Sequence, residues 1–399
     1  MDPSAAICVL YDSLRQEPPV VPIETANQWY SQGISMALTP QYNGISVQSA
    51  PQAQYADANR YAILQKVKDA FETEGFIQAR DATNSFENIG RSIFINRAAI
   101  KLANTDAVHK VSGQLFTFDN KTSMDPFTFC DVAAGPGGFT QYLQYRYKRA
   151  IGYGMTLRHE TLDWNTRSLD MTRFTAFYGP DNTGNLYTNW EPFINYVLSK
   201  EENGVDLVTA DGGFDLEDNM DKTLLHRQEF LSSRLLLTQA VIGVACAKIG
   251  GNFMVKVFDT VTTFSAHVLF VLAQCFERIL IFKPISSRPA NSERYVICMN
   301  KNREVQPYYQ LLSGAARFYK DDIYSDTLFS EGIPQSFQQW LTESNNQSIA
   351  RQLQAAQAIL LYLKGTPAPL AAYDIEKFLV IWNLPDTPPH PRQTAIQIR

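Results

Sequence analysis

The chain has 399 residues, a length that allows two or three domains, and its 45% hydrophobic content is typical of a globular protein. The formal net charge of −5 excludes the overall basic character of many nucleic-acid-binding proteins. Contact with RNA would therefore need a local patch, for which Arg146, Lys148 and Arg149 are candidates. A solvated helix end explains these three residues equally well.

The cysteines and histidines form neither a disulfide framework nor a local metal site. The five cysteines lie far apart without a C-x-x-C pair, and the five histidines are scattered. The N-terminus does not have a signal-peptide pattern, and the longest apolar stretch, 235–249, is too short to cross a membrane. We therefore expect an intracellular protein, nuclear or cytoplasmic, in a reducing compartment, with no membrane segment and no metal.

The first part of the chain is expected to be an extension followed by helices. Residues 1–60 are rich in Pro, Gln and Ser and show weak periodicity, which indicates an N-terminal extension. Helical patterns follow at 61–74 and 96–106. We assign both helices to an upstream platform that spans residues 61–125.

From residue 126 the pattern changes to short apolar strands that alternate with helices. This order predicts an α/β domain at 126–303 with a doubly wound, mostly parallel sheet. Only a loop separates the last two strands, so we expect seven strands with one late antiparallel strand. The expected strands are 127–130, 151–157, 174–178, 205–210, 253–258, 278–282 and 295–299. The expected helices are 140–149, 191–198, 224–247 and 265–275.

The last part of the chain, 304–399, is predicted to be helical and to end in a Pro-rich tail at 385–391. Its clearest helical segment is 347–364. Together with the upstream platform, this part flanks the α/β domain.

A glycine-rich segment follows the first strand of the expected sheet and opens the next helix. It reads DVAAGPGGF and spans residues 131–139. Its glycines let the backbone approach a ligand, and the helix start presents free N–H groups at the carboxyl edge of the sheet. The pattern differs from G-x-G-x-x-G and favours a ligand smaller than a dinucleotide, such as S-adenosylmethionine. A tight strand–helix turn that packs against the sheet is the alternative.

Charged residues lie at the ends of the expected elements or within them: Lys101, Asp211, Lys256 and Glu293. Lys256 falls inside an apolar strand, where a buried ammonium is unfavourable unless it is paired. It is therefore either an edge residue that reaches solvent or a functional group. Asp211 by itself is best explained as a cap or turn residue before Gly212.

Together these segments resemble the FtsJ-type 2′-O-methyltransferases, and they are most similar to the eukaryotic and viral mRNA cap enzymes that make cap 1. The similarity is carried by FINRAAIKLAN, DVAAGPGGFTQYL, GYGMTL, VTADGGF, GGNFMVKVFD and KPISSRPANSERYVIC. The resemblance implies a Rossmann-like, S-adenosylmethionine-dependent methyltransferase fold with helical flanking segments. It also implies a catalytic Lys–Asp–Lys–Glu tetrad made of Lys101, Asp211, Lys256 and Glu293.

The resemblance further implies where the cofactor and the substrate bind. Arg80 is expected near the cap triphosphate, and Glu293 is expected to contact the substrate. The segment 214–230 is longer than usual for the family, and Asn185 stands where the cap enzymes have an acidic residue. The implied partner is the capped 5′ end of mRNA, with capping or transcription machinery as a further partner. The implied cofactor contacts are Asn96, Asp131, Ala133, Ala134, Gly135, Pro136, Gly137, Gly138, Phe139 and Asn185.

The implied reaction moves a methyl group from a sulfonium to the ribose 2′-hydroxyl of the first transcribed nucleotide of m7G-capped mRNA. We expect Lys256 to act as a general base or to orient the hydroxyl, with Asp211 and Glu293 as its positioners and Lys101 as an electrostatic tuner. Two alternatives stay open: a 2′-O-methyltransferase for another RNA position (cap 2, ribosomal or transfer RNA), and a non-catalytic RNA-binding subunit with the same fold. A nicotinamide dehydrogenase is disfavoured because the G-x-G-x-x-G motif is absent.

Overall fold

The structure is a computed structural model that describes most of the chain. The described ranges are 27–30, 36–42, 44–45, 53–70, 75–87, 89, 94–112, 123–213, 228–319, 324–365 and 374–384. The Pro-rich tail, most of the N-terminal extension and residues 214–227 lie outside these ranges. Within them, no helix is long and apolar enough to span a membrane.

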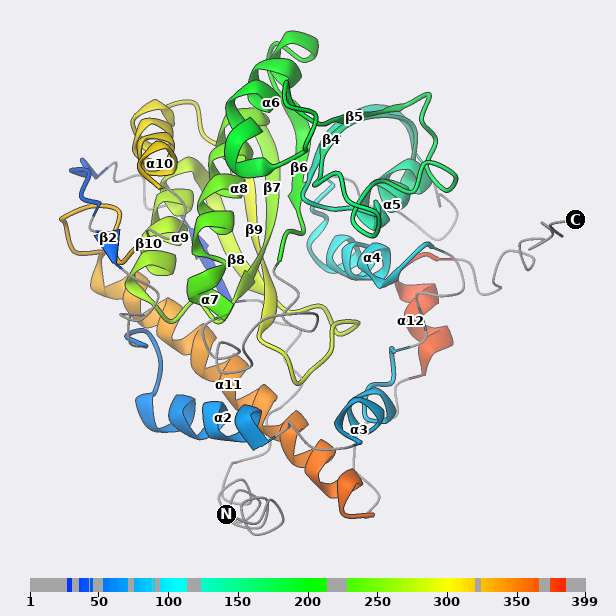
Figure 1. Cartoon of the computed structure of the whole chain (residues 1–399), viewed down its shortest axis with the longest axis vertical. Helices are drawn as coiled ribbons and strands as arrows, with labels where there is room; N and C mark the ends of the chain where they lie inside the picture. Colours follow the sequence, from blue (N-terminus) through cyan, green and yellow to red (C-terminus); the bar gives the residue numbers. More distant parts are fainter. Residues whose placement is uncertain are drawn as a thin grey trace, which may run out of the picture.

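A mixed sheet forms the centre of the molecule (Figure 1). Its strands are β1 (Asn27–Tyr30), β3 (Ser123–Val132), β4 (Tyr147–Met155), β5 (Phe174–Phe177), β6 (Val205–Ala210), β7 (Ala247–Phe258), β8 (Phe276–Phe282) and β9 (Glu293–Lys301). Their order is β1-β8-β9-β7-β6-β3-β4-β5. All neighbours from β7 to β5 are parallel, whereas β9 is antiparallel to both β7 and β8. This confirms the mostly parallel sheet with a late antiparallel return.

The sheet has one strand more than the seven that the sequence predicts. β1 comes from the N-terminal extension and pairs antiparallel with β8, from Asn27 opposite Ile281 to Tyr30 opposite Arg278. The ring of Trp29 packs edge-on against that of Phe337, with centroids 5.1 Å apart. A strand of four residues carries too little periodicity to be recognised, and only its distant partner defines it.

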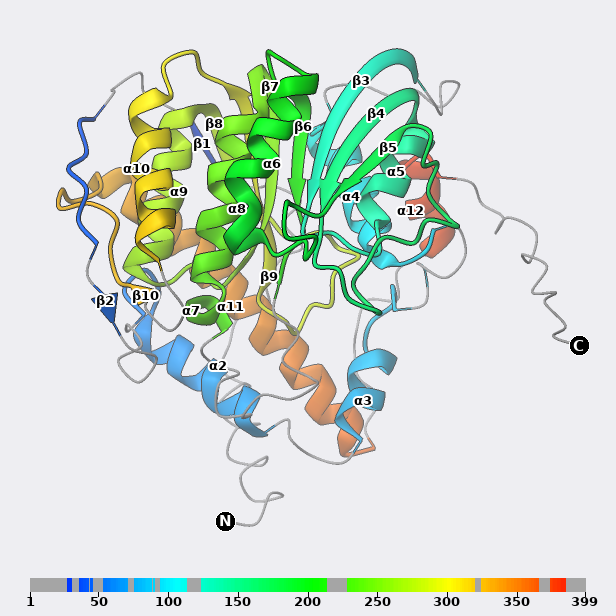
Figure 2. The same cartoon turned by 45° about the horizontal axis from the view of Figure 1, so that its top comes forward.

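Helices cover both faces of the sheet (Figure 2). One face packs against α6 (Leu186–Lys200), α8 (Ser233–Cys246), α9 (Thr263–Cys275) and α10 (Gln306–Phe318), and its core includes Val208 and Val255. The other face packs against α4 (Arg97–His109), α5 (Gly138–Arg146) and α12 (Ile375–Ile381), and its core includes Phe129 and Tyr295. The remaining elements are α7 (Gln228–Leu231) and a two-stranded sheet of β2 (Gly44–Ile45) and β10 (Tyr324–Ser325).

Three helices from the flanking segments lie below the sheet in the view of Figure 1. They are α2 (Ala58–Ala70), α3 (Phe76–Ala82) and α11 (Gln335–Leu363), which share a small core of their own. Asn345 on α11 ties this layer to the sheet: its oxygen accepts from Arg294 at 2.7 Å, and its amide donates to the carbonyls of Tyr55 and Thr260 at 2.8 and 2.9 Å. Both flanks of the chain therefore meet at one end of the sheet.

The helix after the glycine-rich segment ends at Arg146, not at residue 149 as the sequence predicts. Arg146 is buried, and its guanidinium donates to the Tyr142 hydroxyl at 2.9 Å and to the Trp382 carbonyl at 3.3 Å. It is therefore neither a solvated helix end nor part of a surface patch. Only Lys148 and Arg149 of the proposed basic patch are exposed.

Candidate active site

Two adjacent strands carry Lys256 and Glu293 to the same end of the sheet. In the antiparallel pair of β7 and β9, Lys256 lies opposite Tyr295, and Phe258 lies opposite Glu293. Side chains of opposite residues, and of residues two apart on a strand, share one face. Lys256 and Glu293 therefore lie on the face that α4 and α5 cover. Asp211, directly after β6, reaches the same end because β6 and β7 are parallel neighbours.

The structure brings the predicted tetrad together as two ion pairs. The ammonium of Lys101, on α4, lies 2.6 Å from Oε1 of Glu293. The ammonium of Lys256 lies 3.3 Å from Oδ1 of Asp211. All four side chains are mostly buried, so each charge has an opposite charge within reach while its contact with water is small.

Burial and charge act in opposite directions on Glu293, whose side chain is 9% exposed. Burial alone would raise the pKa of this carboxyl, but the ammonium groups of Lys101 and Lys256 hold it well below its usual range. The Ser287 hydroxyl also donates to the same carboxylate, at 3.0 Å. Glu293 is therefore ionised at neutral pH and keeps Lys101 in place.

Tyr295 is a member of the site that the sequence reasoning missed. Its hydroxyl donates to Oδ1 of Asp211 at 2.9 Å, the same oxygen that Lys256 contacts. One signal was available, because Tyr295 follows Glu293 by two residues on a strand and must share its face. The partner of the hydroxyl could not be inferred, since Asp211 is 84 residues away in the chain.

Lys283 is a second residue that was not predicted. Its ammonium donates to the carbonyl of Asn291 at 2.7 Å, to the side-chain oxygen of Asn291 at 2.8 Å and to the carbonyl of Glu293 at 2.9 Å. It thereby closes the loop between β8 and β9 at its base. This bracing places Glu293 at a fixed position at the start of β9.

The glycine-rich segment lies at the carboxyl end of β3, between the ends of β4 and β6. Asp211 adjoins it, since its N–H donates to the carbonyl of Val132 at 3.3 Å. Ala133, Gly135 and Pro136 are partly exposed. The buried members are Ala134, Gly137, Gly138 and Phe139.

Close packing within the protein accounts for two of the glycines. A Cβ at Gly135 would lie 1.7 Å from the carbonyl oxygen of Leu162, and one at Gly138 would lie 2.2 Å from Oδ1 of Asn96. At both positions the close approach expected for a ligand is made by the protein itself. The tight-turn explanation therefore holds at these two positions, and ligand binding by the segment stays a prediction.

The polar residues predicted to contact the cofactor have partners inside the protein. Asp131 is fully buried and accepts from the N–H and hydroxyl of Thr140 and from the hydroxyl of Thr209, and burial raises its pKa to about 7. Asn96 and Asn185 are the N-caps of α4 and α6 and accept backbone N–H groups at 3.0 Å. Each residue thus has a structural role next to the segment.

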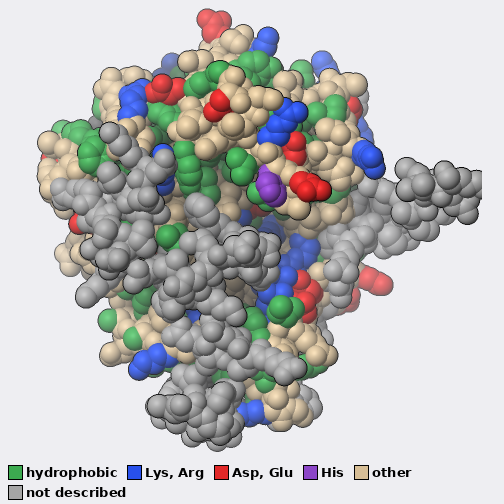
Figure 3. Space-filling view, viewed as in Figure 1, with side chains coloured by type: hydrophobic (Ala, Val, Ile, Leu, Met, Phe, Trp, Pro, Cys, Tyr) green, Lys and Arg blue, Asp and Glu red, His purple; other side chains and the backbone are tan. Residues whose placement is uncertain are grey.

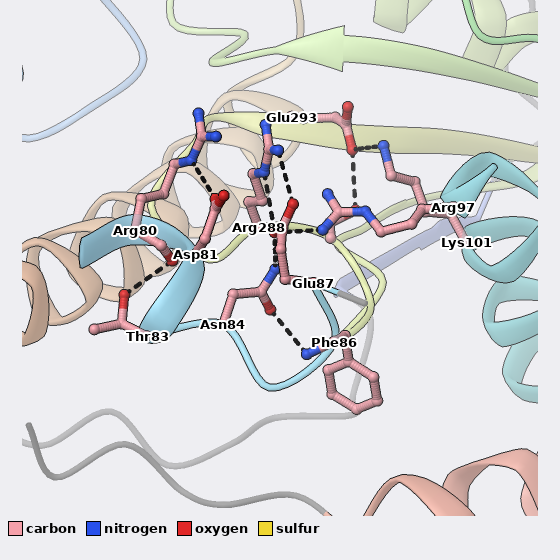
Figure 4. Close-up of polar contacts among 11 residues, drawn as sticks. Arg80, Asp81, Thr83, Asn84, Phe86, Glu87, Arg97, Lys101, Arg288 and Glu293 are labelled. Atoms are coloured by element: carbon pink, nitrogen blue, oxygen red, sulfur yellow. Dashed lines mark hydrogen bonds and ion pairs between the residues drawn. The ribbon is translucent and has the colours of Figure 1, made fainter. Parts of the chain in front are cut away.

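Arg80 lies on α3, outside the tetrad. Its side chain is 13% exposed, and its Nε is 3.0 Å from Oδ1 of Asp81. In Figure 4 its guanidinium points to the same side as that of Arg288, while Lys101 and Glu293 lie at the opposite end of the group. On the face seen in Figure 3, Lys and Arg side chains gather in a hollow.

Residues 94–301, just over half of the chain, match the family model described as FtsJ-like methyltransferase. The chain belongs to this family. The FtsJ-like chain is 33% identical over 364 residues to the cap-specific mRNA (nucleoside-2′-O-)-methyltransferase 1 of Danio rerio, covering 84% of this chain and 43% of that relative. The human protein of the same name is 32% identical over 357 residues, covering 82% and 42%.

The FtsJ-like chain thus spans less than half the length of these curated relatives. Among solved structures, it is similar to a chain described as a ribosomal RNA methyltransferase from Plasmodium falciparum, with a TM-score of 0.33 and 18% identity. That similarity covers 52% of this chain and 97% of the other. The family membership confirms the resemblance read from the sequence segments.

Proposed function

We propose that the chain transfers a methyl group from S-adenosylmethionine to the ribose 2′-hydroxyl of the first transcribed nucleotide of m7G-capped mRNA. The observation that carries the proposal is the pair of ion pairs, Lys101–Glu293 and Lys256–Asp211, at the sheet edge beside the glycine-rich segment. Relatives named for cap-specific 2′-O-methylation, at 32–33% identity, support the substrate class.

The residues at this edge fit S-adenosylmethionine, on which FtsJ-like methyltransferases depend. The partly exposed backbone at 133, 135 and 136 offers a surface without bulky side chains next to Asp211. When bound, the cofactor supplies an electrophilic methyl group on a sulfonium. The contribution of this chain is to hold that ligand against the segment while the tetrad receives the ribose.

The lysines act on the ribose in the proposed reaction. A 2′-hydroxyl is a weak nucleophile, so its oxygen must be aligned with the methyl group or lose its proton. Lys256 lies near the carboxyl end of β7 beside Gly213, where we assign it to orient the hydroxyl or to accept its proton. Asp211 holds Lys256, and the Lys101–Glu293 pair keeps a second positive charge nearby.

The proposal extends to the organisation and setting of the protein. We assign the methyltransferase core to 126–303, with the platform 61–125 and the helical segment 304–399 as its flanks. The described cysteines, Cys130, Cys246, Cys275 and Cys298, are buried and free, which suits a reducing nuclear or cytoplasmic compartment. Capping or transcription machinery is the partner that such a substrate implies.

Methyl transfer to short RNAs with and without an m7G cap tests the proposal. We expect the capped RNA to be methylated at least about tenfold faster in kcat/KM, with the product on the 2′-oxygen of the first transcribed nucleotide. The alternative, a ribosomal or transfer RNA substrate, would be favoured by equal rates on capped and 5′-triphosphate RNA. A product at an internal nucleotide would favour it as well.

Lys256→Ala is the inactive control for this assay. It should abolish methyl transfer and leave S-adenosylmethionine binding within a few-fold. It also removes the cation paired with the mostly buried Asp211, so a lower free energy of unfolding is expected, although the Tyr295 hydroxyl still donates to that carboxylate. Activity within about tenfold of the parent would show that Lys256 is structural.

A further inference from the structure

Glu87 is a mostly buried carboxylate that lies between two arginines next to the tetrad (Figure 4). It accepts from Arg97 at the start of α4, and from Nε and Nη2 of Arg288, in the loop between β8 and β9, at 3.2 and 2.8 Å. The amide of Asn84 adds a fourth donor at 2.7 Å. One carboxylate therefore fixes two guanidiniums that come from distant parts of the chain.

The same two arginines are connected to the tetrad. Arg97 lies one helical turn before Lys101 on α4, so both side chains project from the same side of the helix. Arg288 follows Ser287, whose hydroxyl donates to Glu293 at 3.0 Å. The Lys101 ammonium lies 2.6 Å from Oε1 of Glu293, so the residues next to the two arginines contact each other. The position of the guanidiniums is thus set relative to the proposed reacting groups.

Glu87 carries one negative charge and lies between two arginines. Both guanidiniums bind this one carboxylate. The bond of Arg97 to Glu87 uses one of the five N–H donors of the Arg97 guanidinium. The Arg288 side chain is 30% exposed. Burial alone would raise the pKa of Glu87, but the bonds from Arg288 and Asn84 and the charges of the two arginines lower it to about 2. The carboxylate is therefore ionised at neutral pH.

We propose that Glu87 is a positioning residue that holds Arg97 and Arg288 as a preformed clamp for a phosphate group of the RNA near the methylated ribose. This inference rests on the proposed function. Planar guanidiniums bind phosphate oxygens through paired N–H groups. When they are fixed before the RNA arrives, the entropy lost on ordering them no longer weakens binding.

Glu87→Gln separates positioning from charge balance, because the two roles predict opposite results. Removal of a negative charge alone would tighten RNA binding and steepen its salt dependence by about one phosphate contact. Loss of positioning instead raises KM for capped RNA about tenfold, with kcat within about twofold and S-adenosylmethionine binding unchanged. As a matched control, Glu191→Gln removes the partner of Arg317 in an exposed pair 2.7 Å apart and should change none of these quantities.

Arg288→Lys is the second variant, since it keeps the charge and loses the two-nitrogen contact with Glu87. We expect the same rise in KM for capped RNA. If Glu87→Gln does not fold, Arg288→Lys alone tests whether the contact with Glu87 positions the guanidinium. An unchanged or lower KM, or a joint loss of kcat and S-adenosylmethionine binding, overturns the inference. Failure of the wild-type protein to methylate capped RNA refutes the proposed function instead. In that case fluorescence anisotropy with the same RNAs compares the RNA affinity of the variants and the parent, which tests the clamp without catalysis.

Discussion

A single oxygen of Asp211 receives both the Lys256 ammonium and the Tyr295 hydroxyl. A lysine side chain is flexible, so its position depends on what holds its charged end. Tyr295 is fully buried and its ring packs against that of Phe139, with centroids 6.1 Å apart. The rigid tyrosine therefore fixes the carboxylate, and the carboxylate fixes the lysine.

Replacement of Tyr295 by Phe should lower kcat about tenfold and leave KM for RNA within about twofold, because Asp211 loses the bond that orients it towards Lys256. Steady-state kinetics with capped RNA measures both constants. Tyr153→Phe is the matched control, since its hydroxyl also donates to a carboxylate, Glu201, at 2.9 Å. If both variants keep the parental kcat, the Tyr295 bond serves stability alone.

Among the elements, the glycine-rich segment allows little change in its backbone or side chains at Gly137. Gly137 has φ 104°, in the left-handed region, and a Cβ there would lie 2.8 Å from Cδ1 of Leu169 and 3.1 Å from Cε3 of Trp164. Side chains are disfavoured at such a φ, and here they would also collide with the core. The turn into α5 therefore needs glycine for two independent reasons.

Gly137→Ala should reduce the free energy of unfolding by about 2–4 kcal/mol and weaken S-adenosylmethionine binding as the turn is displaced. Gly250→Ala isolates the backbone contribution, because Gly250 has φ 75° and no atom of the described residues lies within 4 Å of the place its methyl group would take. Urea unfolding and calorimetric titration provide the two readouts. Equal destabilisation by both substitutions would mean that packing against Leu169 contributes nothing.

The regular elements of the sheet were predictable where local signals were strong. β6 matches its predicted range, 205–210, because an apolar run is bounded by Gly204 before it and Asp211 after it. β4 begins earlier than predicted because Tyr147 and Ala150 are buried while Lys148 and Arg149 between them are exposed, and that polar pair resembles a helix end.

Residues whose roles depend on partners far along the chain were not predictable in the same way. The tetrad was expected only through the family resemblance, whereas sheet register now explains why Lys256 and Glu293 share a face. Glu87 contacts Arg288, 201 residues away, and no periodicity or motif marks that pair. Such contacts follow from the packing of whole segments, which a local pattern does not contain.

Among the residues that the structure describes, His267 is buried and His109 is half-buried, and protonation of either opposes folding. The ring of His267 stacks on Phe329 with centroids 3.9 Å apart and its Nδ1 accepts the N–H of Leu328 at 3.2 Å, and His109 packs edge-on against Phe282. Burial lowers the pKa of both to about 4. In the unfolded chain histidine titrates near ~6.5, so the unfolded state binds more protons between these values.

The contribution of each histidine to the free energy of unfolding should therefore fall as the pH is lowered from about 6.5 to 4, by on the order of 2–3 kcal/mol. Asp131, whose pKa is raised to about 7, contributes in the opposite direction over this range. Urea unfolding at several pH values measures the slope. His267→Gln should remove the contribution of His267 to the slope, because glutamine can still accept from Leu328 but does not titrate. A variant with the parental slope would exclude His267 as a source of the acid sensitivity.

The side chain of Asn345 connects α11 to the two strands that carry Lys256 and Glu293 of the candidate site. Through it, one helix braces Thr260, just beyond the end of the strand that bears Lys256, and Arg294, the residue after Glu293. The ends of the two strands thus contact one helix, which lies outside the family-matched segment 94–301. A protein trimmed to that segment would keep every member of the tetrad and the pairing of β7 with β9, yet lose the contacts that hold the ends of both strands to one helix.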